Sequence, residues 1–331
     1  ENLKTIDPFV VNVEDDSREP MQWRVFDDRP FEFLLKIVKK DAQTGNTVLK
    51  AGASYKIYDV TNKKYIEQVV QYPKKEKISV FQTNEEGYLI TPQELKCSTY
   101  RIEEVKAPEG FVRQGYEESL YDGATILSPL DQTAKGTYKE NPQSAIEITV
   151  SSNTAHQIDP DTRAAIVEVE QKNDEQVGSL LLTKKGEQPT EVTGDSVLAK
   201  VKTLVSKVKN AVSGKEETGI YKGFKYEETG VEGAQFEVYA KDTIYSPDGA
   251  KDEEGNPLVR YEKDDLVAKL TTDEEGMAVL NNLPMGTYYL KEVVAGENFV
   301  LNTEQKEFTL TAEDDTQAVV YEGVTYKNER Q

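Results

Sequence analysis

The sequence has one cysteine, Cys97, and one histidine, His156, in 331 residues. A single cysteine excludes an internal disulfide bond, and a single histidine argues against histidine-based catalysis and against a zinc site with several histidines. Cys97 has no activating neighbour, so we expect an inert thiol. The chain also shows no signal peptide, no apolar run long enough to cross a membrane and no Gly-rich phosphate loop. If the chain contains a covalent cross-link, that cross-link is not a disulfide bond within the chain.

Positive charge is scarce relative to negative charge, with 40 Lys and Arg against 60 Asp and Glu and a net charge of -20. This balance argues against binding to nucleic acid and against docking on anionic membranes, because both need a basic surface. It suits a soluble, exposed surface protein. The length favours two domains. The 18 tyrosines, the many β-branched residues and the frequent turn signals favour β-structure.

Alternation of apolar and polar residues predicts the strands of a first β unit. These strands are Phe31–Lys40, Gly52–Tyr58, Tyr100–Val105, Ala145–Val150 and Ala165–Asn173. A hairpin-type turn is expected at Asp41–Asn46 and a turn entering a strand at Thr83–Leu89. Residues 1–24 are either a linker from a preceding module or an edge strand, and most of residues 112–160 is polar and loop-like.

The pattern then repeats in the second half of the chain. Five blocks recur in the same order, at Ser179–Gly186, Gly233–Tyr239, Thr272–Ala278, Tyr288–Val293 and Val324–Glu329. Duplication of a β module explains this best, and the domain-sized period indicates a tandem array rather than a solenoid. We therefore expect two tandem β-sandwich domains, at residues 25–175 and 176–331, after an N-terminal segment at residues 1–24.

Residues 193–213 break the β pattern. Apolar residues recur there at helical spacing between lysines, at Val197, Val201, Leu204, Val205, Val208 and Val212. Gly214 can end such a helix. We expect an amphipathic helix inserted after the first strand of the second domain. Packing on that domain's sheet is the simpler interpretation. The alternative is a helix that contacts a partner or a membrane surface, although its apolar stripe is narrow.

Each repeat places three polar residues on faces that are otherwise apolar. They are Lys39, Glu104 and Asn173 in the first repeat, and Lys184, Glu292 and Asn328 in the second. The alternation selects each of them: Lys39, for example, shares a face with Leu35 and Ile37, whereas Lys40 does not. For any one of these residues alone, the ordinary interpretation is simpler: a lysine or glutamate near a strand end usually extends to water, and an asparagine at a strand end usually belongs to a turn. The same triplet twice, in order and on the correct faces, favours shared chemistry.

Burial would give these three residues a common reaction. Burial favours the neutral forms of an amine and of a carboxylic acid, and a neutral amine is a nucleophile. A carboxylic acid held against an asparagine amide would polarise its carbonyl and pass protons to leaving ammonia. The product is an isopeptide bond, Lys39 to Asn173 assisted by Glu104, and Lys184 to Asn328 assisted by Glu292. This single-turnover reaction needs no cofactor, so we do not expect an enzyme that acts on a substrate.

Several blocks together resemble a Cna protein B-type (CnaB, SpaA-like) domain. In the first repeat they are Val38–Asp41, Gly52–Tyr55, Thr83–Gly87, Tyr100–Phe111 and Lys172–Asn173. In the second repeat they are Lys184, Gly233–Phe236, Glu292 and Asn328. The resemblance covers about residues 30–331, with gaps at the insertions. The second repeat departs from the pattern by lacking the proline of Ala107–Pro108, and the first by carrying Gln171 where an apolar residue is commoner.

The resemblance implies a prealbumin-like (Ig-like) β-sandwich, self-catalysed isopeptide bonds and a place in the pilins and adhesins of Gram-positive bacteria. It further implies an extracellular, cell-wall location, attachment or polymerisation by a sortase, and other pilin subunits or domains of the same protein as partners. Tyr72–Lys75 partly resembles a pilin motif whose lysine joins subunits, but it lacks the usual asparagine, and we interpret it as coincidence.

Two other functions remain as alternatives to a structural module. A ligand-binding adhesin tip would recognise a host extracellular protein or glycan through the inserted loops. A glycosidase would need paired carboxylates in an open cleft, whereas the distinctive acids here lie on buried faces. The acidic stretches Asp252–Asn256 and Asp273–Gly276 lack the spacing of a dedicated calcium loop, and we expect solvated turns and no metal.

Overall fold

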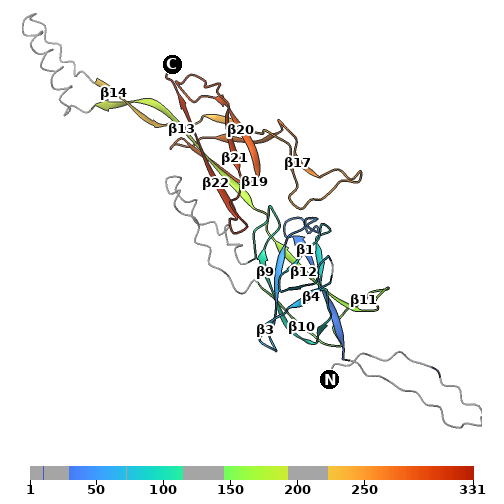
Figure 1. Ribbon diagram of the computed structural model, residues 1–331. Helices are drawn as coiled ribbons and strands as arrows, with labels where there is room; N and C mark the ends of the chain where they lie inside the picture. Colours follow the sequence, from blue (N-terminus) through green and yellow to red (C-terminus); the bar gives the residue numbers. More distant parts are fainter. Residues whose placement is uncertain (1–9, 11–29, 72, 115–144, 193–222) are drawn as a thin grey trace, which may run out of the picture.

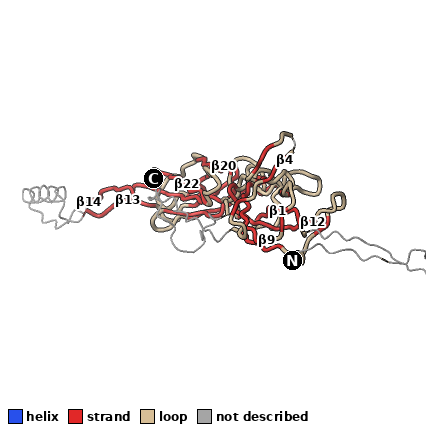
Figure 2. Tube along the Cα trace, turned by 60° about the horizontal axis from the view of Figure 1, so that its bottom comes forward, coloured by secondary structure: helices blue, strands red, loops and turns tan. Residues whose placement is uncertain are grey.

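The structure is a computed structural model that describes residues 10, 30–71, 73–114, 145–192 and 223–331 (Figure 1). Strands, turns and loops make up this part of the chain, without an α-helix (Figure 2). The expectation of a mainly β chain is therefore confirmed. The helix expected at residues 193–213 lies outside the described residues, as do most of the segment 1–24 and residues 115–144 of the expected polar insertion. No helix of the described part is long and apolar enough to cross a membrane.

Two sheets between Glu32 and Asn173 form what we call the first sheet pair. One contains, in order, β11 (Gln157–Ile158), β12 (Ala165–Asn173), β1 (Glu32–Asp41) and β7 (Tyr88–Ile90), with β8 (Leu95–Lys96) also paired to β1. The other contains β10 (Ile146–Val150), β9 (Ser98–Lys106), β2 (Ser54–Asp59) and β3 (Lys64–Tyr65), with β6 (Phe81–Gln82) paired to β2. A separate ribbon joins β4 (Gln68–Val70) to β5 (Glu76–Ile78).

Two sheets between Val177 and Asn328 form the second sheet pair. One contains β14 (Gly223–Gly230), β13 (Val177–Val192) and β19 (Met277–Pro284), with β22 (Val319–Asn328) also paired to β13. The other contains β18 (Leu266–Thr271), β15 (Gln235–Ala240), β20 (Gly286–Val294) and β21 (Lys306–Leu310). A ribbon of β16 (Ile244–Tyr245) and β17 (Val259–Tyr261) lies beside them.

Each sheet pair encloses its own hydrophobic core, because alternate residues of its strands point between the sheets. In the first pair the buried cluster joins Phe33, Leu35 and Ile37 of β1 to Tyr55 of β2 and Ile102 of β9. In the second pair it joins Leu180 and Leu182 of β13 to residues of β15, β20 and β21, namely Phe236, Val238, Leu290 and Phe308. The alternation that predicted the inward faces of β1, β9 and β13 is thus confirmed.

In each sheet pair the first strand lies parallel to the last strand. In the β1–β12 pairing Lys39 lies opposite Gln171, and Asp41 lies opposite Asn173. In the β13–β22 pairing Lys184 lies opposite Tyr326, and Gly186 lies opposite Asn328. The inward-facing asparagine is therefore offset by two residues from the position opposite the lysine. The glutamates come from β9 and β20, which belong to the facing sheets, so all three side chains meet in the core.

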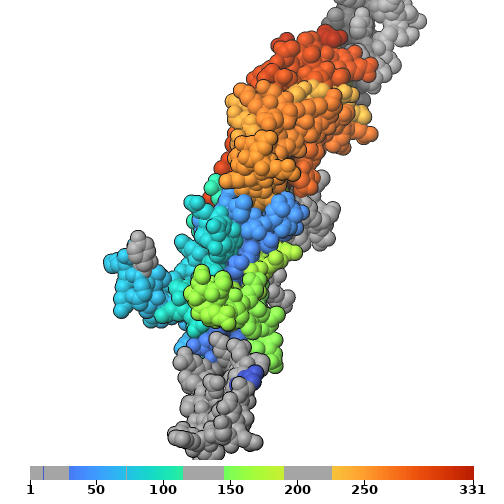
Figure 3. All heavy atoms as spheres, turned by 90° about the vertical axis from the view of Figure 1, so that its right-hand side faces the viewer, coloured from blue at the N-terminus to red at the C-terminus, as the bar shows by residue number. Residues whose placement is uncertain are grey.

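The two sheet pairs lie end to end, with their contact between the blue-green and the orange parts of the chain (Figures 1 and 3). Polar contacts cross this junction. The Arg260 guanidinium donates two hydrogen bonds to the Glu175 carboxylate. Asp248 Oδ2 accepts hydrogen bonds from Asn46 Nδ2 at 3.1 Å and from the Thr44 hydroxyl at 3.3 Å. One ion pair and two hydrogen bonds to the buried Asp248 carboxylate thus link the two sheet pairs.

Candidate functional site

A glycine turn fixes the backbone of each predicted lysine. The Lys39 N–H donates to Gly87 O at 2.8 Å, and the Lys184 N–H donates to Gly276 O at 2.6 Å. Both glycines have positive φ, 78° and 74°. A Cβ on Gly87 would lie 2.1 Å from Val48 O, so the turn has no room for a side chain. This explains why the turn blocks at residues 83–89 and 272–278 recur in both halves of the sequence.

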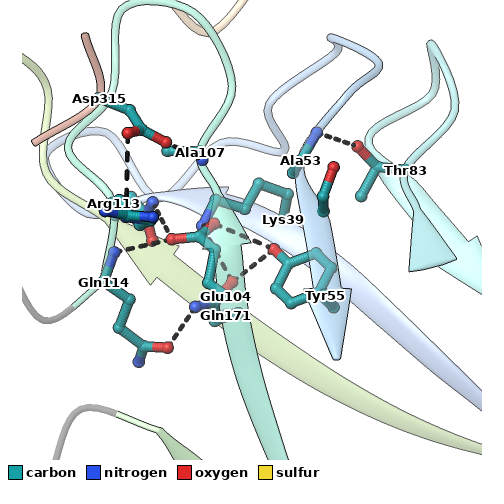
Figure 4. Close-up of polar contacts among 12 residues, drawn as sticks. Lys39, Ala53, Tyr55, Thr83, Glu104, Ala107, Arg113, Gln114, Gln171 and Asp315 are labelled. Atoms are coloured by element: carbon teal, nitrogen blue, oxygen red, sulfur yellow. Dashed lines mark hydrogen bonds and ion pairs between the residues drawn. The ribbon is translucent and has the colours of Figure 1, made fainter. Parts of the chain in front are cut away.

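In the first site Glu104 contacts both of its predicted partners. Lys39 Nζ donates a hydrogen bond to Glu104 Oε1 at 2.7 Å, and both side chains are wholly buried (Figure 4). Asn173 Nδ2 donates to the other carboxylate oxygen, Oε2, at 2.7 Å. The structure therefore brings the three residues together, with Glu104 between the lysine amine and the asparagine amide.

The second site repeats this arrangement. Lys184 Nζ lies 2.8 Å from Glu292 Oε1, again with both side chains wholly buried. Asn328 Nδ2 donates to Glu292 Oε2 at 2.7 Å. Burial lowers the pKa of Lys184 from its usual 10.5, against the opposing effect of the nearby Glu292. Desolvation therefore favours the neutral, nucleophilic form of this amine.

Each asparagine leaves one acceptor unused. Among the described residues no hydrogen-bond donor reaches Asn173 Oδ1 or Asn328 Oδ1, although both atoms are buried. Such an unpaired carbonyl costs about 1–3 kcal/mol in a folded protein. At both sites, therefore, the hydrogen bonding of the buried polar cluster is incomplete at the asparagine carbonyl oxygen.

A backbone N–H completes each site. Gln114 N–H donates to Glu104 Oε2 at 2.8 Å, and Asn302 N–H donates to Glu292 Oε2 at 2.7 Å. In both cases the donor lies ten residues after the glutamate and follows the turn that ends the glutamate strand. Sequence reasoning missed these donors because every residue type except proline supplies a backbone N–H.

The first site also contains a polar network that the sequence did not predict. Gln171 Oε1 accepts hydrogen bonds from Lys39 Nζ at 3.0 Å and from the Tyr55 hydroxyl, and Gln171 Nε2 donates to Gln114 Oε1 at 2.5 Å (Figure 4). Burial, together with the nearby Glu104, raises the pKa of Tyr55 well above its usual 10, so this hydroxyl stays protonated and donates. Gln171 is therefore hydrogen-bonded through both the oxygen and the nitrogen of its side-chain amide.

The second site has Phe236 and Tyr326 at the positions that Tyr55 and Gln171 occupy in the first site. Phe236 lies opposite Glu292 as Tyr55 lies opposite Glu104, and Tyr326 lies opposite Lys184 as Gln171 lies opposite Lys39. The Tyr326 hydroxyl donates to Leu290 O at 2.9 Å. Burial raises the pKa of Tyr326 to about 12. The surroundings of the second lysine are thus more apolar than those of the first.

The other residues singled out in the sequence have ordinary structural roles. Cys97 is half-buried, its thiol donates to Phe31 O at 3.5 Å, and burial raises its pKa, which disfavours the reactive thiolate. In the two acidic turns, Asp252 and Asp273 each accept hydrogen bonds from backbone N–H groups of their own turn. In the described ranges no group of three or more His, Cys, Asp or Glu residues is placed to hold a metal ion. Of the partial pilin motif at Tyr72–Lys75, Tyr72 lies outside the described residues, and the remaining three are exposed.

Comparison with known proteins gives one family and several remote structural neighbours. The family described as "SpaA: Prealbumin-like fold domain" matches residues 34–118 and 217–325. No curated protein matches the sequence. The Bacillus anthracis TIE protein is 16% identical with a TM-score of 0.44, over 92% of this chain and 35% of that one, so the chain spans about a third of its length.

Two pilins are similarly remote. A streptococcal ancillary pilin is 18% identical with a TM-score of 0.28, over 96% of this chain and 68% of that one. The minor pilin GBS52 of Streptococcus agalactiae is 16% identical with a TM-score of 0.26, over 90% of this chain and 96% of that one.

Proposed function

The chain belongs to the SpaA prealbumin-like fold domain family, and on that premise we propose that it is a structural module of a Gram-positive cell-surface pilin or adhesin. In this proposal the two sheet pairs are tandem CnaB-like domains. Each is closed by a self-catalysed isopeptide bond, Lys39 to Asn173 and Lys184 to Asn328. One observation carries the proposal: in both sheet pairs a buried glutamate contacts a buried lysine with one carboxylate oxygen and the asparagine amide with the other.

The placement of the two carboxylate oxygens suits proton transfer through the glutamate. The neutral Lys39 amine attacks Cγ of Asn173, and the bond from Cγ to Nδ2 breaks as the bond from Nζ to Cγ forms. Glu104 Oε1, beside Nζ, takes up a proton from the attacking amine. Oε2, beside Nδ2, delivers a proton to the leaving nitrogen, which departs as ammonia. Amine and amide thus become a new amide and ammonia, with no cofactor consumed.

Burial and proximity supply the driving conditions for this reaction. Lys39 and Lys184 are both fully buried. The apolar core favours the neutral amine, and the shared glutamate holds the lysine amine and the asparagine amide on its two carboxylate oxygens. The second site follows the same scheme with Lys184, Glu292 and Asn328 in the corresponding roles.

The bonds would change how the chain responds to force and heat. β1 and β12 are parallel neighbours that begin and end the first sheet pair, as β13 and β22 do for the second. A bond between the first and last strands of a domain would hold the domain closed when its ends are pulled. By analogy with a disulfide that closes a loop of similar length, restriction of the unfolded chain contributes roughly 4–5 kcal/mol per bond. Unlike a disulfide, the bond is insensitive to reducing conditions.

The proposal places the protein outside the cell, on the wall or in a pilus, with neighbouring pilin subunits or domains as partners and a sortase as the enzyme that attaches or polymerises it. Isolation of the protein from purified cell walls tests the location. The alternative is a ligand-binding tip. We favour the structural role because both sheet pairs hold the same buried Lys–Glu–Asn arrangement. Mass spectrometry of the intact protein tests the chemistry, because each isopeptide bond lowers the mass by one molecule of ammonia.

A further inference from the structure

A loop of the second sheet pair lies against the first reactive site. This loop, residues 311–318 between β21 and β22, brings Asp315 to the end of β9. Asp315 Oδ2 accepts a hydrogen bond from the buried Ala107 N–H at 2.8 Å, and its backbone O accepts one from the Arg113 N–H at 2.7 Å. Asp315 Oδ1 also lies 3.8 Å from Arg113 Nε. Asp315 therefore holds both ends of the segment 107–113 (Figure 4).

That segment leads directly to the reactive carboxylate. The residue after Arg113 is Gln114, whose N–H donates to Glu104 Oε2 at 2.8 Å. This is the oxygen that also accepts the hydrogen bond from Asn173 Nδ2. Arg113 Nη1 donates to Val105 O at 3.1 Å, which closes the turn back on β9. A shift of the turn would therefore move the donor that orients Glu104.

The same loop also holds the chain that follows Asn173. Gln176 Nε2 donates to Asp314 O at 2.7 Å and to Gln317 O at 2.9 Å. Two backbone hydrogen bonds tie the two flanks to each other, from Val112 N–H to Asp174 O and from Gln176 N–H to Gly110 O. The flanks of Glu104 and of Asn173 thus meet on one loop from the other sheet pair.

The second site has the same turn after its glutamate strand, but a different residue stands at the position of Arg113. Asn302 N–H donates to Glu292 Oε2, and Val300 N–H donates to Glu329 O at 2.9 Å, as Val112 N–H does to Asp174 O. The residue that corresponds to Arg113 is Leu301, which is 43% exposed. The second turn thus has an exposed leucine at the place where the first turn has Arg113, whose N–H and side chain meet Asp315 of the neighbouring sheet pair.

We propose that Asp315 is a positioning residue for the first isopeptide bond, so that docking of the second sheet pair promotes bond formation in the first. The inference rests on the proposed function. Without the Asp315 carboxylate, the buried Ala107 N–H loses its acceptor and the turn that carries the Gln114 N–H relaxes. Small displacements of a group that orients a reacting centre lower rates steeply, so we expect the first bond to form roughly 10-fold to 100-fold more slowly.

The test follows both bonds over time in the full chain. The protein is produced by cell-free synthesis, samples are taken at intervals, and the fraction of each bond is measured by mass spectrometry of proteolytic peptides. Asp315→Ala should slow the Lys39–Asn173 bond and leave the Lys184–Asn328 bond at its wild-type rate. Asp315→Asn keeps an oxygen acceptor for the Ala107 N–H and should restore most of the rate. Glu109→Ala, which removes an exposed acid from the same turn, is the matched control.

The outcomes separate this inference from the proposed function. If the wild-type protein keeps the mass of the linear sequence, so that no ammonia has been lost, the proposed function itself is refuted. Wild-type kinetics of the first bond in Asp315→Ala refute only the positioning role. Equal slowing of both bonds in that variant shows a general folding defect and also overturns the inference. Selective slowing of the first bond, with rescue by Asp315→Asn, supports it.

Discussion

Tyr55 and Phe236 occupy the same register position, each directly opposite the buried glutamate of its own sheet pair. The difference between them is one hydroxyl group. In the first site that hydroxyl donates to Gln171 Oε1, which also accepts from Lys39 Nζ. In the second site Phe236 packs 4.9 Å, between ring centroids, from Tyr326. The two sites thus hold the same three reactive groups in surroundings of different polarity.

Removal of the Tyr55 hydroxyl should destabilise the first sheet pair without abolishing the cross-link. Tyr55→Phe leaves the buried Gln171 Oε1 with one donor fewer, and we expect a loss of about 1–3 kcal/mol of unfolding free energy. Denaturant unfolding in a Glu104→Gln background, where the first bond is absent, measures this loss. Tyr58→Phe, on the outward face of the same strand, is the matched control. Equal stability of the two variants would contradict the importance of the network.

Substitution of either glutamate should prevent one bond and spare the other. Glu104→Gln keeps the shape of the side chain but removes the group that moves protons between Lys39 and Asn173. The protein should then be heavier than wild type by one ammonia, with the first bond missing and the second present. Glu292→Gln should give the reverse pattern. The bonds are read from peptide masses, and a cross-link that persists at the substituted site would show that the glutamate does not assist.

Asn173→Ala should abolish the first bond even though a second amide is close to the lysine. Lys39 Nζ contacts Gln171 Oε1 at 3.0 Å, but Gln171 Nε2 donates to Gln114 Oε1 rather than to Glu104. The glutamate therefore has no direct path for delivering a proton to that nitrogen as a leaving group. Fragmentation of the Lys39 peptide checks this. A bond from Lys39 to Gln171 in the variant would show that proximity alone is sufficient.

The rate at the second site should depend on pH through the Lys184 amine. Burial lowers the pKa of Lys184 below its usual 10.5. The reactive neutral fraction grows as the pH rises and is half-maximal at the pKa, so the rate should reach half its maximum below pH 10.5. Newly synthesised protein transferred to a series of buffers gives this profile. A half-maximal rate at or above the ordinary lysine value would contradict the role of burial.

Local alternation was sufficient to predict which side chains point inward. Lys39, Glu104 and Asn173 all lie on the buried faces of β1, β9 and β12. This worked because a side chain's face in a strand depends only on its parity within that strand. The repeat indicated that the same strand order, with the same three inward polar residues, occurs twice.

Features that depend on register or on distant segments could not be predicted in the same way. Gln171 contacts Lys39 because β1 and β12 pair in parallel with these residues opposite each other, and the sequence does not specify that register. Asp315 lies 208 positions from Ala107, whose N–H it accepts. Backbone donors such as the Gln114 N–H carry no residue signature. The polar network and the junction therefore emerged only from the three-dimensional arrangement.

The two proposed cross-links are tested most directly by the intact mass of the unsubstituted protein, followed by peptide mapping. We expect a mass lower than that of the linear sequence by two molecules of ammonia. We also expect two branched peptides, one joining Lys39 to Asn173 and the other joining Lys184 to Asn328. A mass equal to that of the linear sequence, with all four residues recovered in unbranched peptides, would contradict both cross-links.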